Sequence, residues 1–297
     1  MTMSGGNQYV ADLAWVIGCK QGEFSHYPAT NLIESDMDVS QFWAPDINER
    51  LAALVMNPEP LENAVRACKS HFLGSYFETL FSFAIRHLSC FNILCEHVQV
   101  MDKDKKTVGE IDMLVETPAG ECIQFEVAIK FYLERTDLYP HHWIGPNKND
   151  SLKKKVDRAR RHQLQILGTE DGKHVLRSVT NDTTFQAKLL IFGRLYLALS
   201  SPEKVISFCE NSHFGGWVRV SQVDLLLPFF SYYIHLNKPH WLTVSNSSRD
   251  LCFFEAQCMN EWRKSFQEDV RPKHIVLLRE LEGRMSCHFV FIVPDSW

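Results

Sequence analysis

The amino-acid sequence predicts an α/β fold in which a mixed sheet is flanked by helices. Three observations predict it. Apolar residues recur at helical spacing from Leu61 to about Leu88, three strand patterns follow between Phe91 and Tyr132, and a basic helix pattern then leads into a strand that ends at Leu199. The order is therefore helix, three strands, helix and strand, and such helices can cover the faces of one sheet.

The first long helix is expected over Leu61–Leu88. Its apolar positions lie three or four residues apart, so they form one stripe that should pack on a sheet. These positions include Leu73, Phe77, Leu80, Phe81, Ala84 and Leu88.

Three strands are expected next, at Phe91–Val100, Val108–Glu116 and Glu121–Tyr132. The polar turn Asp102–Lys106 joins the first two, and a Pro-Ala-Gly turn at residues 118–120 joins the last two. Because both connections are short, the three strands are predicted to form a meander.

The chain is expected to continue as a loop at His141–Asp150, a basic helix at Ser151–Leu167 and a strand at Phe185–Leu199. Near the N-terminus, a short helix is predicted at Asp12–Cys19 and a turn at Asn57–Pro60.

The part beyond residue 200 is expected to contain further strands at "GWVRV", "HWLTV", "HIVLLREL" and "CHFVFIV", with a helix at Phe253–Phe266. The predicted division is an N-terminal extension at 1–60, a core at 61–200 and a C-terminal α+β extension at 201–297, both extensions packing on the core.

The composition is that of an ordinary globular protein. Of 297 residues, 45% are hydrophobic and 23% charged, which argues against disorder and collagen-like repeats. The formal net charge of −5 does not itself indicate a nucleic-acid-binding protein, although a local basic patch could serve that purpose.

The cysteines and the apolar runs indicate in which cellular compartment the protein is expected. Nine cysteines without a CxxC pair suit reduced core thiols better than disulfides or a zinc site, which favours the cytoplasm. No basic signal-peptide region and no apolar run of membrane-spanning length is found, so no membrane association is expected.

The predicted hairpin at Gly109–Lys130 contains two carboxylates and a lysine that are candidates for a functional site. Side chains alternate across a strand, so Asp112 on one strand and Glu126 and Lys130 on the next fall on the faces opposite the apolar ones. Asp112 and Glu126 can therefore share a face.

Two converging carboxylates repel each other unless a cation neutralises them. Their oxygens suit Mg²⁺ or Mn²⁺, and a nearby ammonium could orient a water or stabilise a phosphoryl transition state. The alternative is a solvated sheet face with cross-strand ion pairs, each worth about 1 kcal/mol or less.

A family resemblance extends this interpretation. The element order and the segments "LGSYFETLFSF", "GEIDMLV", "FEVAIKFYL" and "HWIGPN" resemble a bacterial family of unknown function within the PD-(D/E)XK nuclease superfamily. The nuclease-like likeness covers about residues 60 to 200, and it implies a restriction-endonuclease-like core.

The resemblance also implies roles for individual residues. Asp112 and Glu126 would be metal ligands, with the carbonyl after Glu126 as a further ligand, and Lys130 would be the catalytic lysine. Glu78 matches the helix glutamate and falls at the edge of the apolar stripe, where a polar residue merely flanking that stripe is the alternative. The usual lysine position, two residues after the acid, holds Ala128, so Lys130 must reach back along the strand.

The basic helix adds Gln163 as an auxiliary residue. Measured from Leu152 on a helical wheel, Gln163 lies within about 40 degrees, inside the apolar stripe, where an amide needs a partner. The resemblance implies a glutamine facing the active site, and an amide at the rim of the core is the alternative.

The opposite surface of this helix is a candidate nucleic-acid contact. The cations there are Lys153, Lys154, Arg158 and Arg161. A solvated helix face is the alternative. In the preceding loop, Trp143 and the adjacent His141 and His142 could stack on a nucleic acid or simply lie on the surface.

The expected function is metal-dependent hydrolysis of nucleic-acid phosphodiester bonds, with DNA favoured over RNA. The alternative is a catalytically inactive nucleic-acid-binding or interaction module with the same fold, which Ala128 and the acidic net charge favour.

Overall fold

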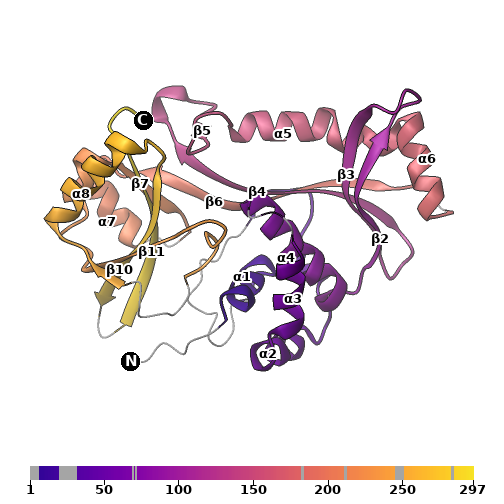
Figure 1. Cartoon of the computed structure of the whole chain (residues 1–297), viewed down its shortest axis with the longest axis horizontal. Coiled ribbons are helices and arrows are strands. Elements are labelled where there is room, and N and C mark those ends of the chain that lie inside the picture. The colour runs from indigo at the N-terminus through magenta and orange to yellow at the C-terminus, as the bar shows by residue number, and fades with distance from the viewer. Residues whose placement is uncertain are drawn as a thin grey trace. The chain divides into compact units, whose positions relative to one another are not determined.

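The computed structural model describes residues 7–19, 32–68, 70, 72–181, 184–210, 213–244, 251–281 and 284–297. It is an α/β structure with a large mixed sheet flanked by helices (Figure 1), which confirms the predicted fold class at that level. No helix in these ranges is both long and apolar enough to cross a membrane.

The chain divides into two compact units. The central unit contains residues 32–129 and 153–192, and the terminal unit contains residues 130–152, 193–297 and the described part of 1–31. These divisions do not fall at residues 60 and 200, because the long strands β4 (Cys122–Glu134) and β6 (Gln186–Ala198) pass from one unit to the other.

The central unit holds the predicted meander. Strands β2 (Asn92–Met101), β3 (Thr107–Glu116) and β4 are consecutive antiparallel neighbours. Strand β6 lies beside β4, and the short β1 (Leu32–Ser35) pairs with β6. The predicted strands of the core are thus confirmed, with boundaries shifted by a few residues.

Helix α4 (Leu73–Leu88) covers the apolar face of this sheet. The rings of Phe77 and Phe81 pack against Phe192, at centroid distances of 5.0 and 5.6 Å, and Phe81 also meets Phe125 edge-on at 6.3 Å. The predicted packing of this stripe on a sheet is confirmed. Burial of such rings stabilises the core by several kcal/mol in total.

The single helix predicted from Leu61 to Leu88 is wrong, because α3 (Glu59–Ala67) and α4 are separate. Cys68 takes an extended backbone conformation that ends α3. Ser70 then accepts a hydrogen bond from the backbone N–H of Phe72, at 3.2 Å, just before α4 begins. Before them come the 3₁₀ turn η2 (Val39–Phe42) and α2 (Ile47–Met56).

Three helical segments belong to the opposite face of the central sheet, where α5 runs on the far side of the strands from α4 (Figure 1). They are α5 (Leu152–Arg161), the 3₁₀ segment η4 (Gln163–Gly168) and α6 (Glu170–Val179). Ile166 of η4 lies directly over Gly109 of β3, where an added Cβ would be 2.8 Å from its Cδ1.

The basic helix predicted to run to Leu167 therefore stops at Arg161. His162 leaves the α-helical conformation, and the tighter η4 turn follows. Leu164, Ile166 and Leu167 are buried there, so tertiary packing decides the local winding.

The terminal unit continues the strand order β6-β7-β11-β10-β8-β9. Its strands are β5 (Trp143–Ile144), β7 (Gly215–Arg219), β8 (Tyr232–His235), β9 (Leu251–Phe253), β10 (Lys273–Leu281) and β11 (Arg284–Val293). Its helical segments are α1 (Gln8–Val16), η3 (Thr136–Leu138), α7 (Pro202–Glu210), η5 (Val220–Leu225) and α8 (Ala256–Glu268). β7 runs parallel to both β6 and β11, so the sheet is mixed.

The predicted short N-terminal helix and the helix near residue 260 are confirmed as α1 and α8. The strand predicted at "HWLTV" is wrong. There the Thr243 hydroxyl bonds to the buried Asp12 carboxylate at 2.5 Å and the Trp241 indole donates to the Leu236 carbonyl at 3.0 Å, so side-chain bonds fix an irregular segment.

Candidate functional site

Asp112 and Glu126 meet where β3 and β4 stop pairing. Met113 lies opposite Phe125 and Leu114 opposite Gln124, and this alignment puts Asp112 across from Glu126. At that point the Asp112 carboxylate accepts the backbone N–H of Val127, at 3.0 Å. A side chain thus replaces a strand-to-strand bond, and the two carboxyl groups share one face, as alternation predicts.

The Glu126 carboxyl group is almost completely buried, with 1% of the residue exposed. Burial, then the negative charge of Asp112, raises its pKa to about 7, while Lys155 opposes the shift. The side chain of Asp112 also favours the protonated form of Glu126 as a potential hydrogen-bond acceptor, which raises the pKa slightly further. Burial and the neighbouring negative charge therefore favour the protonated form of Glu126.

Lys155 of α5 supplies a cation. Its Nζ lies 2.7 Å from Glu126 Oε1, and the two side chains are 15% and 2% exposed. Sequence reasoning missed this residue. On the helical wheel it lies about 40 degrees from Ala159 and thus beside the apolar stripe, which distinguishes it from the outward-facing lysines.

Glu78 belongs to the same constellation. It is half-buried on α4, and burial followed by the charge of Asp112 raises its pKa, while His97 and, to a smaller extent, Lys155 lower it. The charges of Glu78, Asp112, Glu126 and Lys155 therefore interact within the central unit.

Lys130 has a different partner. It lies on the part of β4 that belongs to the terminal unit, and its ammonium donates to Asp150 Oδ2 at 2.7 Å. The other oxygen of Asp150 accepts the backbone N–H of Ser151 at 2.8 Å. This ion pair fixes the end of the loop before α5.

Gln163 lies in η4, not on the stripe of a continuous helix, so the helical-wheel placement is wrong. Its backbone carbonyl accepts a hydrogen bond from Gln124 Nε2 at 2.9 Å. The side-chain oxygens of both glutamines are buried and have no hydrogen-bond partner within the described residues. Gln124 shares its strand face with Glu126, and unpaired buried oxygens call for a water or other polar ligand.

The predicted basic stripe is exposed on α5, at Lys153, Lys154, Arg158 and Arg161. Lys153 pairs with Asp157 of the same helix at 2.6 Å. Trp143 lies half-buried in the terminal unit. Its ring is 4.9 Å from that of His142, which in turn stacks on the exposed Tyr139 at 5.3 Å.

The carboxylates of Asp112 and Glu126 could supply some, but not all, of the ligands of a hard divalent cation. Within the described residues no group of three or more His, Cys, Asp or Glu side chains is arranged to hold a metal. Mg²⁺, however, commonly uses one or two carboxylates and completes its shell with water. Asp112 and Glu126 match that requirement, and a cation would relieve the repulsion that raises the Glu126 pKa.

The chain matches a family model described as "Domain of unknown function (DUF1853)" over residues 11–293. No curated protein and no solved structure matches it.

Proposed function

As the chain belongs to the DUF1853 family, whose model spans nearly all of it, we propose that its central unit is a restriction-endonuclease-like core that hydrolyses nucleic-acid phosphodiester bonds with Mg²⁺ or Mn²⁺. One observation carries the proposal. The buried Glu126 carboxyl group faces Asp112 at the divergence of β3 and β4, with the Lys155 ammonium 2.7 Å away.

In this proposal Asp112 and Glu126 hold the cation, and the Val127 carbonyl is a further ligand. The backbone N–H of Val127 fixes the Asp112 carboxylate, at 3.0 Å, so one ligand is oriented before any metal binds. A bound cation would supply Lewis-acid stabilisation of the phosphate and a water of lowered pKa.

Lys155 takes the role that the family resemblance gives to Lys130. Its ammonium, held beside Glu126, is suited to orient a water and to offset negative charge on the phosphoryl group. This placement also accounts for Ala128 at the usual lysine position, since the cation comes from α5 instead of β4. Glu78 adds a third carboxyl group that can accept a proton or hold a metal-bound water.

The test is cleavage of single- and double-stranded DNA and RNA by the full chain with Mg²⁺ or Mn²⁺. We expect cleavage, with DNA the better substrate, and a loss of at least about 10²-fold in Asp112→Asn and Glu126→Gln. Glu116→Gln, which removes a carboxylate from the same strand and face, is the matched control and should retain activity.

Activity that survives both substitutions would exclude the assignment. Calorimetric titration with Mn²⁺ gives a second measurement that does not depend on finding the substrate. Mn²⁺ should bind the unsubstituted chain and not the Asp112→Asn variant.

The second candidate is a catalytically inactive module that binds nucleic acid or another partner. Ala128 and the formal net charge of −5 favour it. Binding of DNA that is unaffected by a chelator, with no cleavage by any metal-loaded form, would support this alternative against the nuclease.

A further inference from the structure

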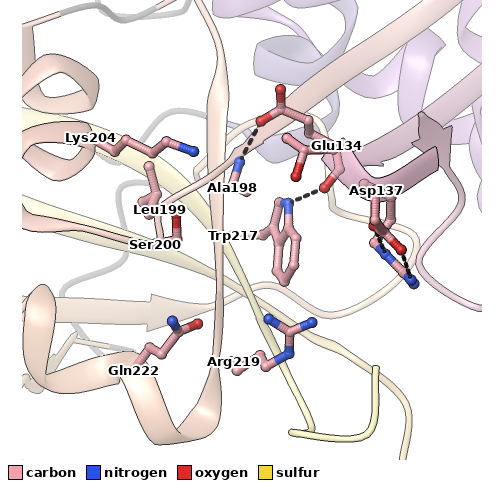
Figure 2. Close-up of a pocket in the computed structure, with 11 residues that line it drawn as sticks. Glu134, Asp137, Ala198, Leu199, Ser200, Lys204, Trp217, Arg219 and Gln222 are labelled. Atoms are coloured by element: carbon pink, nitrogen blue, oxygen red, sulfur yellow. Dashed lines mark hydrogen bonds and ion pairs between the residues drawn. The ribbon is translucent and has the colours of Figure 1, made fainter. Parts of the chain in front are cut away.

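A pocket of about 110 Å³ lies within the terminal unit, between the end of β4, the connection from β6 to α7 and the end of β7 (Figure 2). It is lined by residues of all three segments and is separate from the carboxylate site, which belongs to the central unit. The polar lining side chains that matter below are Glu134, Thr136, Ser200, Lys204, Arg219 and Gln222.

The walls of the pocket are fixed by hydrogen bonds around Glu134. The Glu134 carboxylate accepts the backbone N–H of Ala198 at 3.0 Å, and its backbone carbonyl accepts the indole N–H of Trp217 at 3.0 Å. Figure 2 shows both bonds. Trp217 is only 5% exposed, so these bonds join the ends of β4, β6 and β7 beside the pocket.

Some charged side chains of the pocket form ion pairs with each other, and others do not. Arg135 and Asp137 form a two-pronged ion pair at 2.8 and 2.7 Å and neutralise each other. Lys204 and Arg219 make no ion pair with a carboxylate in the part of the chain that the structure describes. Arg219 donates one long hydrogen bond, at 3.3 Å, to the backbone carbonyl of Trp297, lies 5.6 Å from the centroid of the Trp217 ring, and its charge acts weakly on Asp137.

The remaining groups are mostly donors. The hydroxyls of Thr136 and Ser200 and the amide of Gln222 line the same space as the cations of Lys204 and Arg219. Among the described lining residues, the only anion not in an ion pair is Glu134, and one of its oxygens is already bonded to Ala198. Such a pocket suits a ligand rich in acceptor oxygens that also carries one proton.

We propose that this pocket binds a protonated phosphate, either as inorganic phosphate or as the phosphoryl group of a phosphomonoester. Lys204 and Arg219 bind the charged oxygens, and the P–OH group donates to the free oxygen of Glu134. Donors reach the space from three segments, which fits four tetrahedral oxygens better than a planar carboxylate. The pocket is small, at about 110 Å³, which suits a compact anion such as phosphate.

The proton distinguishes phosphate from sulfate. Sulfate at neutral pH has no proton to donate, so it would meet the Glu134 carboxylate as an unrelieved negative charge. Phosphate should therefore bind more tightly than sulfate, and Glu134→Gln should reduce that difference, because the amide can donate to sulfate.

The test is calorimetric titration of the full chain with inorganic phosphate, sulfate and adenosine monophosphate, in EDTA to exclude metal-bridged binding. We expect phosphate to bind at least about tenfold more tightly than sulfate. We expect Lys204→Gln and Arg219→Gln to weaken phosphate binding by about tenfold or more each. Lys264→Gln, an exposed lysine of α8 in the same unit, is the matched control and should bind as the unsubstituted chain does.

Binding of adenosine monophosphate as well as phosphate would show that a monoester enters with its nucleoside outside, and binding of phosphate alone would restrict the site to the free ion. The proposal is overturned if phosphate does not bind, if sulfate binds equally well, or if Lys264→Gln has the same effect as Lys204→Gln. Abolition of phosphate binding in Asp112→Asn would also overturn it, since that variant tests the other site.

Discussion

At the scale of single residues, the most informative feature is the choice of lysine. Lys155 contacts Glu126 at 2.7 Å, whereas the ammonium of Lys130 is held by Asp150 at the same distance. In the nuclease that we propose, this contact would place the Lys155 ammonium beside the metal-bound phosphate. The structure thus places Lys155, and not the Lys130 that the family resemblance implies, against Glu126.

We predict that Lys155→Gln lowers the rate of nucleic-acid cleavage in Mg²⁺ or Mn²⁺ by at least about 10²-fold. Lys130→Gln should mainly reduce stability, by about 1 kcal/mol, because it breaks a half-exposed ion pair. Circular dichroism of both variants verifies that they fold. If instead Lys130→Gln loses activity and Lys155→Gln retains it, Lys130 is the catalytic lysine, as the family resemblance implies.

The raised pKa of Glu126 predicts how stability depends on pH. The ordinary value is 4.5 and the folded value is about 7, so between these limits the folded state binds more protons than the unfolded state. The free energy of unfolding of the metal-free chain therefore falls as pH rises through this window. Burial is the main cause, since it penalises the ionised form.

We predict that Glu126→Gln gains stability relative to the unsubstituted chain as pH rises from 5 to 8, by about 2 kcal/mol. Urea denaturation in EDTA at both pH values measures the difference. Glu116→Gln is the control and should show the same pH dependence as the unsubstituted chain. Equal slopes for all three proteins would contradict the raised pKa.

The position of Asp112 and Glu126 could be predicted from the sequence because alternation along adjacent strands is a local rule. Lys155 could not be, because its contact with Glu126 joins residues 29 positions apart and depends on where α5 lies over the sheet. Its place beside the apolar stripe was the one signal present in the sequence.

At the scale of elements, packing overrides periodicity in two helices. The apolar spacing continues through residues 61–88 and 152–167, but the structure ends α3 at Ala67 and α5 at Arg161. In the second case the side chain of Ile166 packs directly against Gly109, where a larger residue would have no room for its side chain. Periodicity identifies the face of a helix, but it does not locate a break that tertiary contacts impose.

The exposed cations of α5 predict a salt-dependent interaction. We expect the triple substitution Lys154→Gln, Arg158→Gln and Arg161→Gln to weaken duplex DNA binding and to reduce the slope of log K against log salt by about 0.9 for each phosphate that the variant no longer neutralises. Fluorescence anisotropy at several salt concentrations measures both. The double substitution Arg263→Gln and Lys264→Gln on α8 is the control for exposed cations elsewhere. If the α8 variant changes the slope for each removed cation as much as the α5 variant does, the cations of α5 are not a specific DNA contact.

At the scale of the whole molecule, the linear division predicted from the sequence differs from the compact units. Segments far apart in the chain form the terminal unit, because β4 and β6, each of 13 residues, contribute to both units. Composition and turn signals indicate where a strand starts and ends, but they do not show that the two halves of one strand belong to different compact units. Domain boundaries inside a long strand therefore have no local signature.

Trp297 shows how the terminal unit joins distant segments. Its indole N–H donates to the Pro146 carbonyl at 2.7 Å, and its ring meets Trp217 edge-on at 4.8 Å. The Arg135 guanidinium and the Lys148 ammonium lie 5.3 and 5.6 Å from the ring centroid. One side chain thus contacts the end of β4, the loop before α5 and β7.

We predict that Trp297→Ala lowers the free energy of unfolding by about 3 kcal/mol, since it removes a ring that is only 5% exposed. Trp297→Phe should cost about 1 kcal/mol, because it keeps an aromatic ring and leaves the Pro146 carbonyl without its donor. Phe253→Ala removes a ring that is 67% exposed on the same unit and should change stability by less than about 0.5 kcal/mol. Urea denaturation of the three variants measures this order, and a Trp297→Ala variant as stable as Phe253→Ala would show that the terminal unit does not depend on this contact.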